Sequence, residues 1–400
     1  MYKFKKLSVL VLISAMATAA FAGCSNDLGP ETLPSTEETT TTEETSVETE
    51  TEAEETEETT AEATHGPYSE AVVTDRPIDL NGQLSISGTD IVNENGGIAA
   101  LRGLSSYGLS NTTNFFNNED IVQTLKEDWG ADVLRIAMTV DDNSSSDYIR
   151  DPEKNFDRVC EAADTIIDAG MYVIIDWHVL YDGDPCEHKD EAIDFFSRIS
   201  AIYADCPNVI YEICNEPNGP QFDDESAEVD WERIRSYATD VVAAIRANDP
   251  DNIIICGTPN WSQDVDIASE NPLDDANVCY ALHFYAGSHG QELRDKIITA
   301  RDNGICVFVS EWGTTNDSGD GEIASDSADE WLAFLDECGI SWVNWSIGGS
   351  NPEKSNALKF RNEKILTTEE KYAGHWPDEF LTNSGLYVRS KLWEAKGVSR

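Results

Sequence analysis

The sequence predicts an α/β protein of the (β/α)8 barrel class, the TIM barrel, with an N-terminal β-hairpin, preceded by a signal peptide and a disordered linker. Three observations support this prediction: eight apolar segments alternate with helical patterns, polar residues follow those segments, and residues 65–400 have a globular composition throughout. A barrel of about 250 residues plus extensions accounts for a stretch of this length as one domain.

Near-continuous apolar runs predict parallel strands that are buried on both faces. They occupy residues 98–104, 132–138, 171–178, 208–215, 252–258, 278–285, 305–311 and 340–347. Helical patterns lie between most of them, at 118–129, 155–169, 189–204, 226–247, 290–303 and 325–338. Eight such units predict a closed barrel. An open doubly wound sheet is the alternative, but no glycine-rich phosphate-binding turn follows the first strand.

Residues 81–95 precede the first strand and combine alternating residues with glycine turns. We expect this segment to form a hairpin that closes the amino-terminal end of the barrel. Gly170, Gly304 and Gly339 follow three of the helical patterns, and glycine is preferred just after a helix. These glycines support the predicted helix ends.

The first residues of the chain have the pattern of a secretion signal. Three lysines among the first six residues precede an apolar run at 7–22, which is too short for a comfortable membrane span. Cys24 follows the small residues Ala22 and Gly23 at the end of this run, as in bacterial lipoproteins. We expect removal of residues 1–23 and lipidation of Cys24, which places the protein outside the cell, lipid-anchored at its surface or secreted. Ordinary signal cleavage with an incidental thiol is the alternative.

Residues 24–66 form an acidic linker. Its stretch 31–64 contains 13 Glu and 13 Thr among 34 residues and no aromatic residue, so it has almost nothing to bury and is expected to be disordered. A spacer between a surface anchor and a catalytic domain at 67–400 fits this composition. An acidic interaction tail is the competing interpretation.

The charge of the chain limits its partners. The formal net charge is −49, and the three lysines and fourteen acidic residues of 1–64 leave −38 on residues 65–400. Such a field repels nucleic acid and anionic polysaccharides, whereas a neutral polymer is unaffected. Nucleic acid is therefore not an expected partner. No Cys-x-x-Cys spacing occurs, so the sequence supports neither a zinc site nor a redox motif.

Polar and aromatic residues gather at the ends of the predicted strands. In a barrel of this class the carboxyl ends of the strands carry the active site. Two glutamates stand out because each follows a strand and precedes a loop-forming residue, in Asn215-Glu216-Pro217 and Glu311-Trp312-Gly313. Two carboxyl groups that face each other are the minimum equipment for cleaving a glycosidic bond. The other strand-end candidates are Arg135, Asp176, His178, Trp261, His283, Tyr285 and Trp345.

These motifs together resemble glycoside hydrolase family 5 (cellulase family A), and within it the bacterial subfamily 2 endoglucanases. The resemblance covers residues 78–395 and rests on an ordered set that includes Asp176-Trp177-His178, Asn215-Glu216-Pro217, His283-Phe284-Tyr285, Ser310-Glu311-Trp312-Gly313 and Asn344-Trp345-Ser346. Taken singly, each residue has a structural explanation. A glutamate at a strand end is as often simply exposed or ion-paired as it is catalytic. Trp177 and Trp312 are predicted to be packing residues.

The resemblance implies a role for each matching residue. Glu216 would be the general acid/base, and Glu311 the nucleophile, kept ionised by Arg135 and by the hydroxyl of Tyr285. The substrate-binding residues would be Asn215 for the sugar 2-hydroxyl, His178 and His283 for hydroxyls or the acid/base, Trp345 as the floor of the subsite before the cut, and Trp261 for a neighbouring sugar. The resemblance implies a monomer that needs neither cofactor nor metal.

The chain departs from the family pattern at three places. Tyr107 stands where a sugar-contacting histidine is usual, and Asn111 where a tryptophan is usual, so an aromatic platform is missing unless Phe115 or Phe116 supplies one. After Trp345 an insertion shifts the usual Lys-x-Glu pair. We expect Lys354 to be the equivalent lysine and Asn356 to replace the glutamate. These departures bear on substrate selectivity and not on the bond-breaking chemistry.

The expected function is a secreted, retaining endo-β-1,4-glucanase that hydrolyses cellulose or mixed-linkage β-glucan by double displacement. A mannanase or xyloglucanase on the same barrel is the alternative of the same class. A catalytically silent glycan-binding lipoprotein is an alternative of another class, although the presence of both glutamates counts against it. A serine hydrolase is disfavoured, because the sequence around Ser105 and Ser106 lacks the nucleophile-elbow spacing.

Overall fold

The computed structural model describes residues 73, 75–109, 115–141, 147–180, 183–219, 229–348, 353–359 and 374–398, all of which belong to one compact unit, Ala63–Arg400. The predicted signal peptide, the lipidation site Cys24 and the acidic linker lie outside the described residues, and so does Asn111. Across the described ranges, no helix has the length and apolar character needed to cross a membrane.

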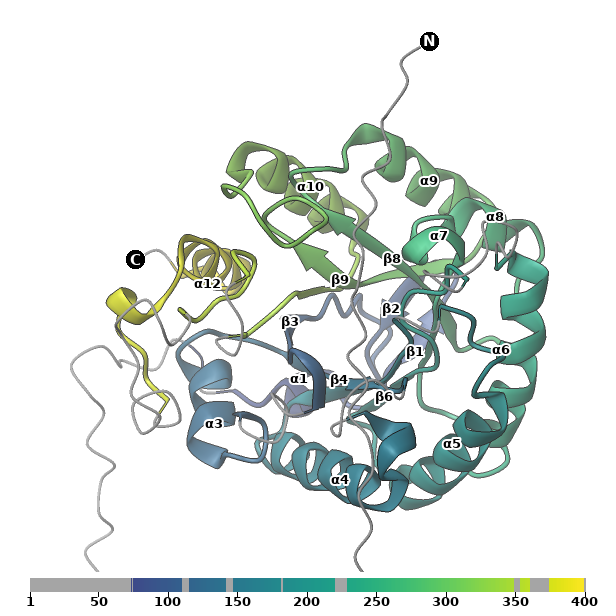
Figure 1. Ribbon diagram of the computed structural model, residues 1–400. Helices are drawn as coiled ribbons and strands as arrows, with labels where there is room; N and C mark the ends of the chain where they lie inside the picture. The colour runs from purple at the N-terminus through teal and green to yellow at the C-terminus, as the bar shows by residue number, and fades with distance from the viewer. Residues whose placement is uncertain are drawn as a thin grey trace, which may run out of the picture. The chain divides into compact units, whose positions relative to one another are not determined.

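Eight parallel strands close into a barrel in the order β10-β3-β4-β5-β6-β7-β8-β9 (Figure 1). The strands are β3 (Arg102–Ser105), β4 (Val133–Thr139), β5 (Tyr172–His178), β6 (Val209–Glu212), β7 (Ile254–Cys256), β8 (Val278–Tyr285), β9 (Cys306–Gly313) and β10 (Trp342–Asn344). Each falls on one of the eight apolar runs, although β3 and β4 continue one residue beyond their runs and β9 continues two. The predicted (β/α)8 barrel is therefore confirmed.

Helices surround the barrel as an outer ring (Figure 1). The six that the sequence predicted are α3 (Glu119–Glu127), α4 (Pro152–Asp168), α5 (Lys189–Tyr203), α6 (Trp231–Arg246), α9 (Gln291–Asp302) and α10 (Ser325–Cys338). Their ends have local causes: the Asn118 side chain accepts a hydrogen bond from the amide of Ile121 at the start of α3, and Gly339 adopts φ 66° at the end of α10. The remaining helices of the described residues are α1 (Pro77–Asn81), α7 (Pro259–Ser262), α8 (Val265–Glu270), α12 (Asn383–Ala395) and the 3-10 turns Tyr148–Arg150 and Asp378–Phe380.

The barrel has two apolar cores, because successive side chains of a strand point to opposite faces. On β5, Val173, Ile175 and Trp177 pack outward against the helices, whereas Tyr172 and Ile174 pack inside the barrel. Trp312 on β9 also belongs to the outer core and is fully buried. The prediction that Trp177 and Trp312 are packing residues is thus confirmed.

The N-terminal hairpin closes the inner core at the amino-terminal end of the barrel. Strands β1 (Ser85–Ser87) and β2 (Asp90–Val92) pair antiparallel, and Leu84 and Ile91 are buried within the inner core cluster. The hydroxyl of Tyr172 donates to the carbonyl of Gly82 at 2.7 Å, which ties the hairpin region to β5. With apolar residues filling this end of the barrel, polar side chains gather at the carboxyl end.

Candidate active site

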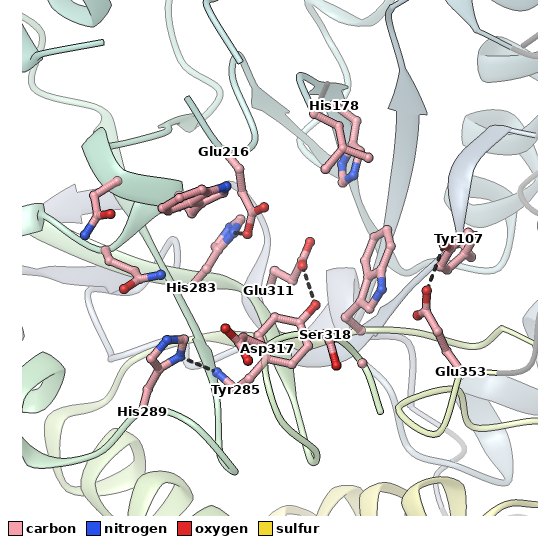
Figure 2. A pocket seen from close by; sticks show the side chains of 16 residues that line it. Tyr107, His178, Glu216, His283, Tyr285, His289, Glu311, Asp317, Ser318 and Glu353 are labelled. Atoms are coloured by element: carbon pink, nitrogen blue, oxygen red, sulfur yellow. Dashed lines mark hydrogen bonds and ion pairs between the residues drawn. The ribbon is translucent and has the colours of Figure 1, made fainter. Parts of the chain in front are cut away.

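A cavity of about 510 Å³ opens at the carboxyl ends of the strands (Figure 2). Of the residues predicted for the site, those that line it are Tyr107, His178, Glu216, Trp261, His283, Tyr285, Glu311 and Trp345. Arg135 and Asn215 are buried beside these residues, with 0% and 1% of their surface exposed. The structure thus brings ten of the eleven predicted catalytic and substrate-binding residues together.

Glu216 and Glu311 face each other across this cavity. One carboxylate oxygen of each, together with one ring nitrogen of His283, lies within 4.8 Å of the other two atoms. A retaining pair of glycosidase carboxyls lies about 5–5.5 Å apart, and an inverting pair about 6.5–9.5 Å apart. The nearest oxygens of the two carboxylates are thus closer than the inverting range, as in a retaining pair. The same three residues could geometrically hold a metal ion, but two-carboxyl glycoside cleavage requires none.

Glu311 is held by hydrogen bonds on both oxygens. The hydroxyl of Tyr285 donates to Oε1 at 2.8 Å, and the guanidinium of Arg135 donates to Oε2 at 3.2 Å. Burial and then the negative charge of Glu216 raise the pKa of Glu311, whereas the charges of His283 and Arg135 lower it. The two donors orient the carboxylate toward the cavity and offset part of the cost of its burial.

Arg135 is the centre of the buried polar network. Besides Glu311, its guanidinium contacts Glu212 at 2.7 Å, Asp176 at 2.9 Å and the side-chain oxygen of Asn215 at 2.7 Å. Burial disfavours the charged guanidinium, but the three carboxylates outweigh burial and raise the pKa of Arg135. Because planar guanidinium groups bind several acceptors in fixed directions, Arg135 sets the relative positions of these side chains.

His178 is held as a neutral imidazole. Its Nδ1 lies 2.7 Å from Asp176, and its Nε2 lies 3.4 Å from the side-chain nitrogen of Asn215. Burial and then the charge of Arg135 lower the pKa of His178 to about 4. The His178 ring also stacks on the indole of Trp345 at 5.2 Å between ring centroids, which joins one predicted sugar-binding side chain to another.

His283 has the opposite electrostatic character. Its Nδ1 lies 2.9 Å from Oε1 of Glu216, and its Nε2 lies 3.0 Å from the hydroxyl oxygen of Ser310. Burial alone would lower its pKa, but the neighbouring carboxylates of Glu212 and Glu216, 3.9 Å and 2.9 Å from its ring nitrogens, outweigh burial and raise the pKa of His283 to about 9. His283 is therefore cationic at neutral pH and contacts Glu216 directly.

A β-bulge aims two consecutive residues of β9 at the site. Ala281 pairs with Phe308 and His283 with Glu311, so β9 has one more residue than β8 between these pairs. The pairing with β10 shows the same excess, between Val309 and Trp312. An extra residue re-aims the side chains that follow it. As a result both Ser310 and Glu311 reach polar side chains of the site, although strict alternation would separate them.

Comparison with known proteins identifies the family. The profile described as Cellulase (glycosyl hydrolase family 5) matches residues 92–351, and endoglucanase A of Evansella cellulosilytica is 46% identical over 299 residues, which is 74% of this chain and 57% of that protein. The chain belongs to glycoside hydrolase family 5. Endoglucanase N of Pectobacterium atrosepticum is 42% identical over 317 residues, covering 79% of this chain and 66% of that protein. This chain therefore spans less than two thirds of the length of these relatives.

A solved structure of the same family shows the same arrangement of elements. A variant of the catalytic domain of Thermobifida fusca endoglucanase Cel5A, determined in complex with cellotetraose, matches with a TM-score of 0.70 and 32% identity, covering 80% of this chain and 99% of that chain. The resemblance to glycoside hydrolase family 5 that the sequence motifs predicted is thus confirmed.

Trp261 lies in a turn whose residues have positive φ angles. Asn260, Trp261 and Ser262 all have φ near +57°, a region that non-glycine residues avoid at a cost of about 1–3 kcal/mol each. The Ser262 hydroxyl donates to the carbonyl of Asn215 at 2.6 Å and holds the turn. This turn leaves Trp261 39% exposed, at the cavity. An exposed aromatic face in that place suits stacking on a sugar ring.

The loop after Trp345 differs from the sequence prediction for Lys354. Lys354 is exposed and is not among the residues that line the cavity, whereas its neighbour Glu353 lines it. Asn356 is fully buried, and its side-chain oxygen accepts a hydrogen bond from the Ser346 hydroxyl at 3.0 Å. The insertion after Trp345 therefore brings a different carboxylate to the cavity than the sequence count suggested.

Tyr107 and Glu353 form a pair on that side (Figure 2). The Tyr107 hydroxyl donates to Oε1 of Glu353 at 2.8 Å, and the Tyr107 ring contacts Trp345 at 5.3 Å between centroids. Phe115 and Phe116 are both fully buried in the outer core, so neither supplies the aromatic platform considered above. Tyr107 is therefore an aromatic side chain that, like His178, lies beside Trp345.

Several further residues line the cavity that sequence reasoning did not select. They are Leu180, Asn260, Gln263, His289, Asp317, Ser318, Gly319 and Glu353. All lie beyond the ends of strands, Asn260 in the short helix α7 and the others in loops, at varying distances from the strand end, so strand-end position alone gave no signal for them. Asn260 and Gln263 flank Trp261 in the quoted motif and could have been found from their place beside it.

Proposed function

We propose that this chain is a retaining endo-β-1,4-glucanase that hydrolyses cellulose or mixed-linkage β-glucan. The observation that carries the proposal is the separation of Glu216 and Glu311, whose carboxylate oxygens lie within 4.8 Å in a cavity lined by Trp261 and Trp345. The endoglucanase names of the two relatives and the cellotetraose bound to the Thermobifida fusca enzyme support this substrate class.

The geometry supports a division of labour between the two acids. Glu311 attacks the anomeric carbon, and the bond from that carbon to the leaving oxygen breaks as Glu216 donates a proton to that oxygen. In the second half, water attacks the anomeric carbon, the bond to Glu311 breaks, and Glu216 accepts a proton from the water. The Tyr285 and Arg135 contacts described above orient the nucleophile.

Hydrolysis of a panel of defined polysaccharides tests the substrate. We expect turnover of carboxymethyl-cellulose and lichenan, with viscosity falling before many reducing ends appear, as internal cleavage requires. Preferred turnover of mannan or xyloglucan would favour the alternative activities on the same barrel. Absence of turnover on every β-glucan would favour a silent glycan-binding protein.

Proton NMR of freshly released sugars tests the mechanism in the same reaction. Two successive displacements restore the starting configuration, so the β-anomer should appear first. Initial α-anomer would contradict both the retaining mechanism and the nucleophile role of Glu311.

We also propose that Cys24 is lipidated and anchors the enzyme at the cell surface, on the strength of the sequence pattern at residues 1–24. The Cys24→Ser protein should be released into the medium with unchanged hydrolytic activity. If the processed Cys24→Ser protein still fractionated with membranes at high salt, this proposal would be wrong.

A further inference from the structure

Two cysteine thiols face each other inside the barrel. Cys279 on β8 and Cys306 on β9 are direct partners in the parallel pairing of these strands. Both belong to the inner core cluster and are only 0% and 3% exposed, and their sulfur atoms lie 3.1 Å apart. Both residues stand at the beginning of their strands, whereas the active site lies at the carboxyl ends.

The backbone holds these two cysteines at the separation that a disulfide bond requires. Neighbouring strands of a sheet lie about 4.7–4.9 Å apart, and the two Cα atoms of a disulfide are usually about 4.4–6.8 Å apart. Because the sulfur atoms are already 3.1 Å apart, a bond of about 2.05 Å requires each to move by about 0.5 Å. Small rotations of the two side chains supply that movement without displacing either strand.

We propose that Cys279 and Cys306 are a disulfide-forming pair, a covalent modification site that joins β8 to β9 at the amino-terminal end of the barrel. The oxidant is a low-molecular-weight disulfide of the glutathione class. The cell-surface location proposed above is a compartment of the kind in which disulfide bonds form and persist. This modification is independent of which glucan the enzyme hydrolyses.

The bond forms by two thiol–disulfide exchanges. In the first, the thiolate of one cysteine attacks the small disulfide, one small thiol leaves, and a mixed disulfide remains on the protein. In the second, the thiolate of the other cysteine attacks the protein sulfur of that mixed disulfide and releases the second small thiol. The two protons lost by the cysteines are taken up by the two departing thiolates. Two protein thiols are thereby oxidised, and one small disulfide is reduced.

Burial determines when this reaction can occur. The thiolate is the reactive form of cysteine. Burial, and then the contact with Cys306, raise the pKa of the Cys279 thiol, so the folded barrel holds little of its thiolate and admits no oxidant to it. The bond should therefore form while β8 and β9 assemble, and the closed barrel should then protect it from reductants.

The expected consequence is a gain in stability without a change in catalysis. The bond closes a loop that contains α9 and spans 27 residues in sequence, and such a loop restricts the unfolded chain. The irregularity in the β8–β9 pairing between Ala281 and His283 separates the cysteines from the catalytic side chains. His283 and Glu311 should keep their positions whether or not the bond is present.

Peptide mapping tests whether the bond forms. The full-length chain is denatured and reduced, then refolded either in a mixture of oxidised and reduced glutathione or in dithiothreitol. Remaining thiols are alkylated, and the digest is analysed by mass spectrometry without reduction. We expect a linked pair of peptides carrying Cys279 and Cys306 in the first sample, and two alkylated peptides in the second. Alkylated Cys279 and Cys306 in a folded sample from the glutathione mixture would overturn the proposal.

Thermal unfolding of the same two samples tests the effect of the bond. The glutathione sample of wild type should unfold roughly 5–10 °C above the dithiothreitol sample. In Cys279→Ala and Cys306→Ala the two samples should have the same midpoint, and comparing samples of one protein cancels the cost of the cavity. Cys279→Ser and Cys306→Ser, which nearly keep the side-chain volume, replace any alanine variant that does not fold.

Cys186→Ser is the matched control. Cys186 is partly exposed, and its thiol donates to the carbonyl of Arg233 at 3.8 Å. This variant should keep the full wild-type difference between the two samples. Equal midpoints for the two wild-type samples, or a difference that persists in Cys279→Ala, would contradict the stabilising role of the bond.

Two further measurements separate this bond from a switch of activity. Both wild-type samples should show the same kcat/KM on cellotetraose, and a clear difference would contradict a purely stabilising role. Folded, reduced enzyme placed in the glutathione mixture without denaturant should stay reduced far longer than the refolding chain. Equally fast oxidation of the folded enzyme would contradict formation of the bond during assembly of the barrel.

Discussion

Glu311→Ala is expected to lose activity on natural and activated glycosides alike, because no glycosyl-enzyme can form without the carboxylate. The loss should exceed the roughly 10²–10⁴-fold that general acid–base assistance supplies. Kinetics on cellotetraose and on an aryl cellobioside with a good leaving group measure it. Circular dichroism and the thermal midpoint check that the variant is folded, since Glu311 accepts hydrogen bonds from Arg135 and Tyr285.

Glu216→Ala is the matched comparison for this prediction. It should lose about 10²–10⁴-fold on cellotetraose, where the leaving oxygen needs a proton. On the activated substrate the first step needs little protonation, so the loss of kcat/KM should be much smaller. Equal losses on both substrates for Glu216→Ala, or a substantial residual activity for Glu311→Ala, would reverse or remove the assigned roles.

Arg135→Ala is expected to cause the largest loss of stability among single changes at the site. Arg135 is fully buried and pairs with Asp176, Glu212 and Glu311, so its removal leaves three carboxylates together without their cation. Breaking a buried ion pair by removing one partner costs about 3–5 kcal/mol. For a domain of this size that cost lowers the thermal midpoint by on the order of 10 °C.

Arg301→Ala is the control for this experiment. Arg301 pairs with Asp90 at 2.8 Å near the surface, with the two side chains 20% and 30% exposed. Such pairs are worth about 1 kcal/mol or less. Differential scanning calorimetry should therefore separate the two variants clearly. A midpoint for Arg135→Ala no lower than that for Arg301→Ala would show that the buried network does not stabilise the fold.

The strand ends show how far the sequence could predict the site. Site candidates such as Glu311 and His283 were found because a parallel strand of apolar residues ends where its loop begins, and local composition marks this boundary. Once the barrel class is known, all carboxyl ends meet at one face. The prediction of a shared site for these residues needed no knowledge of any individual contact.

For the loop after Trp345, the sequence did not predict which side chain reaches the cavity. Counting residues across the insertion pointed to Lys354 and Asn356, whereas the structure places Glu353 at the cavity and in contact with Tyr107. A loop has no side-chain period from which direction could be deduced. Its course depends on contacts such as the amide of Lys354 donating to the carbonyl of Gly319 at 2.9 Å, which joins two loops far apart in sequence.

The sequence by itself determined the barrel, its eight strands and the family of the chain, because apolar runs and strand-end chemistry are local properties. The tertiary structure alone decided that Ser310 joins Glu311 at the site. Alternation along a strand predicts that only one of two adjacent residues faces inward. The bulge that overrides it exists only in the pairing of β9 with β8 and β10, and the contact it creates links Ser310 to Glu212 across 98 residues.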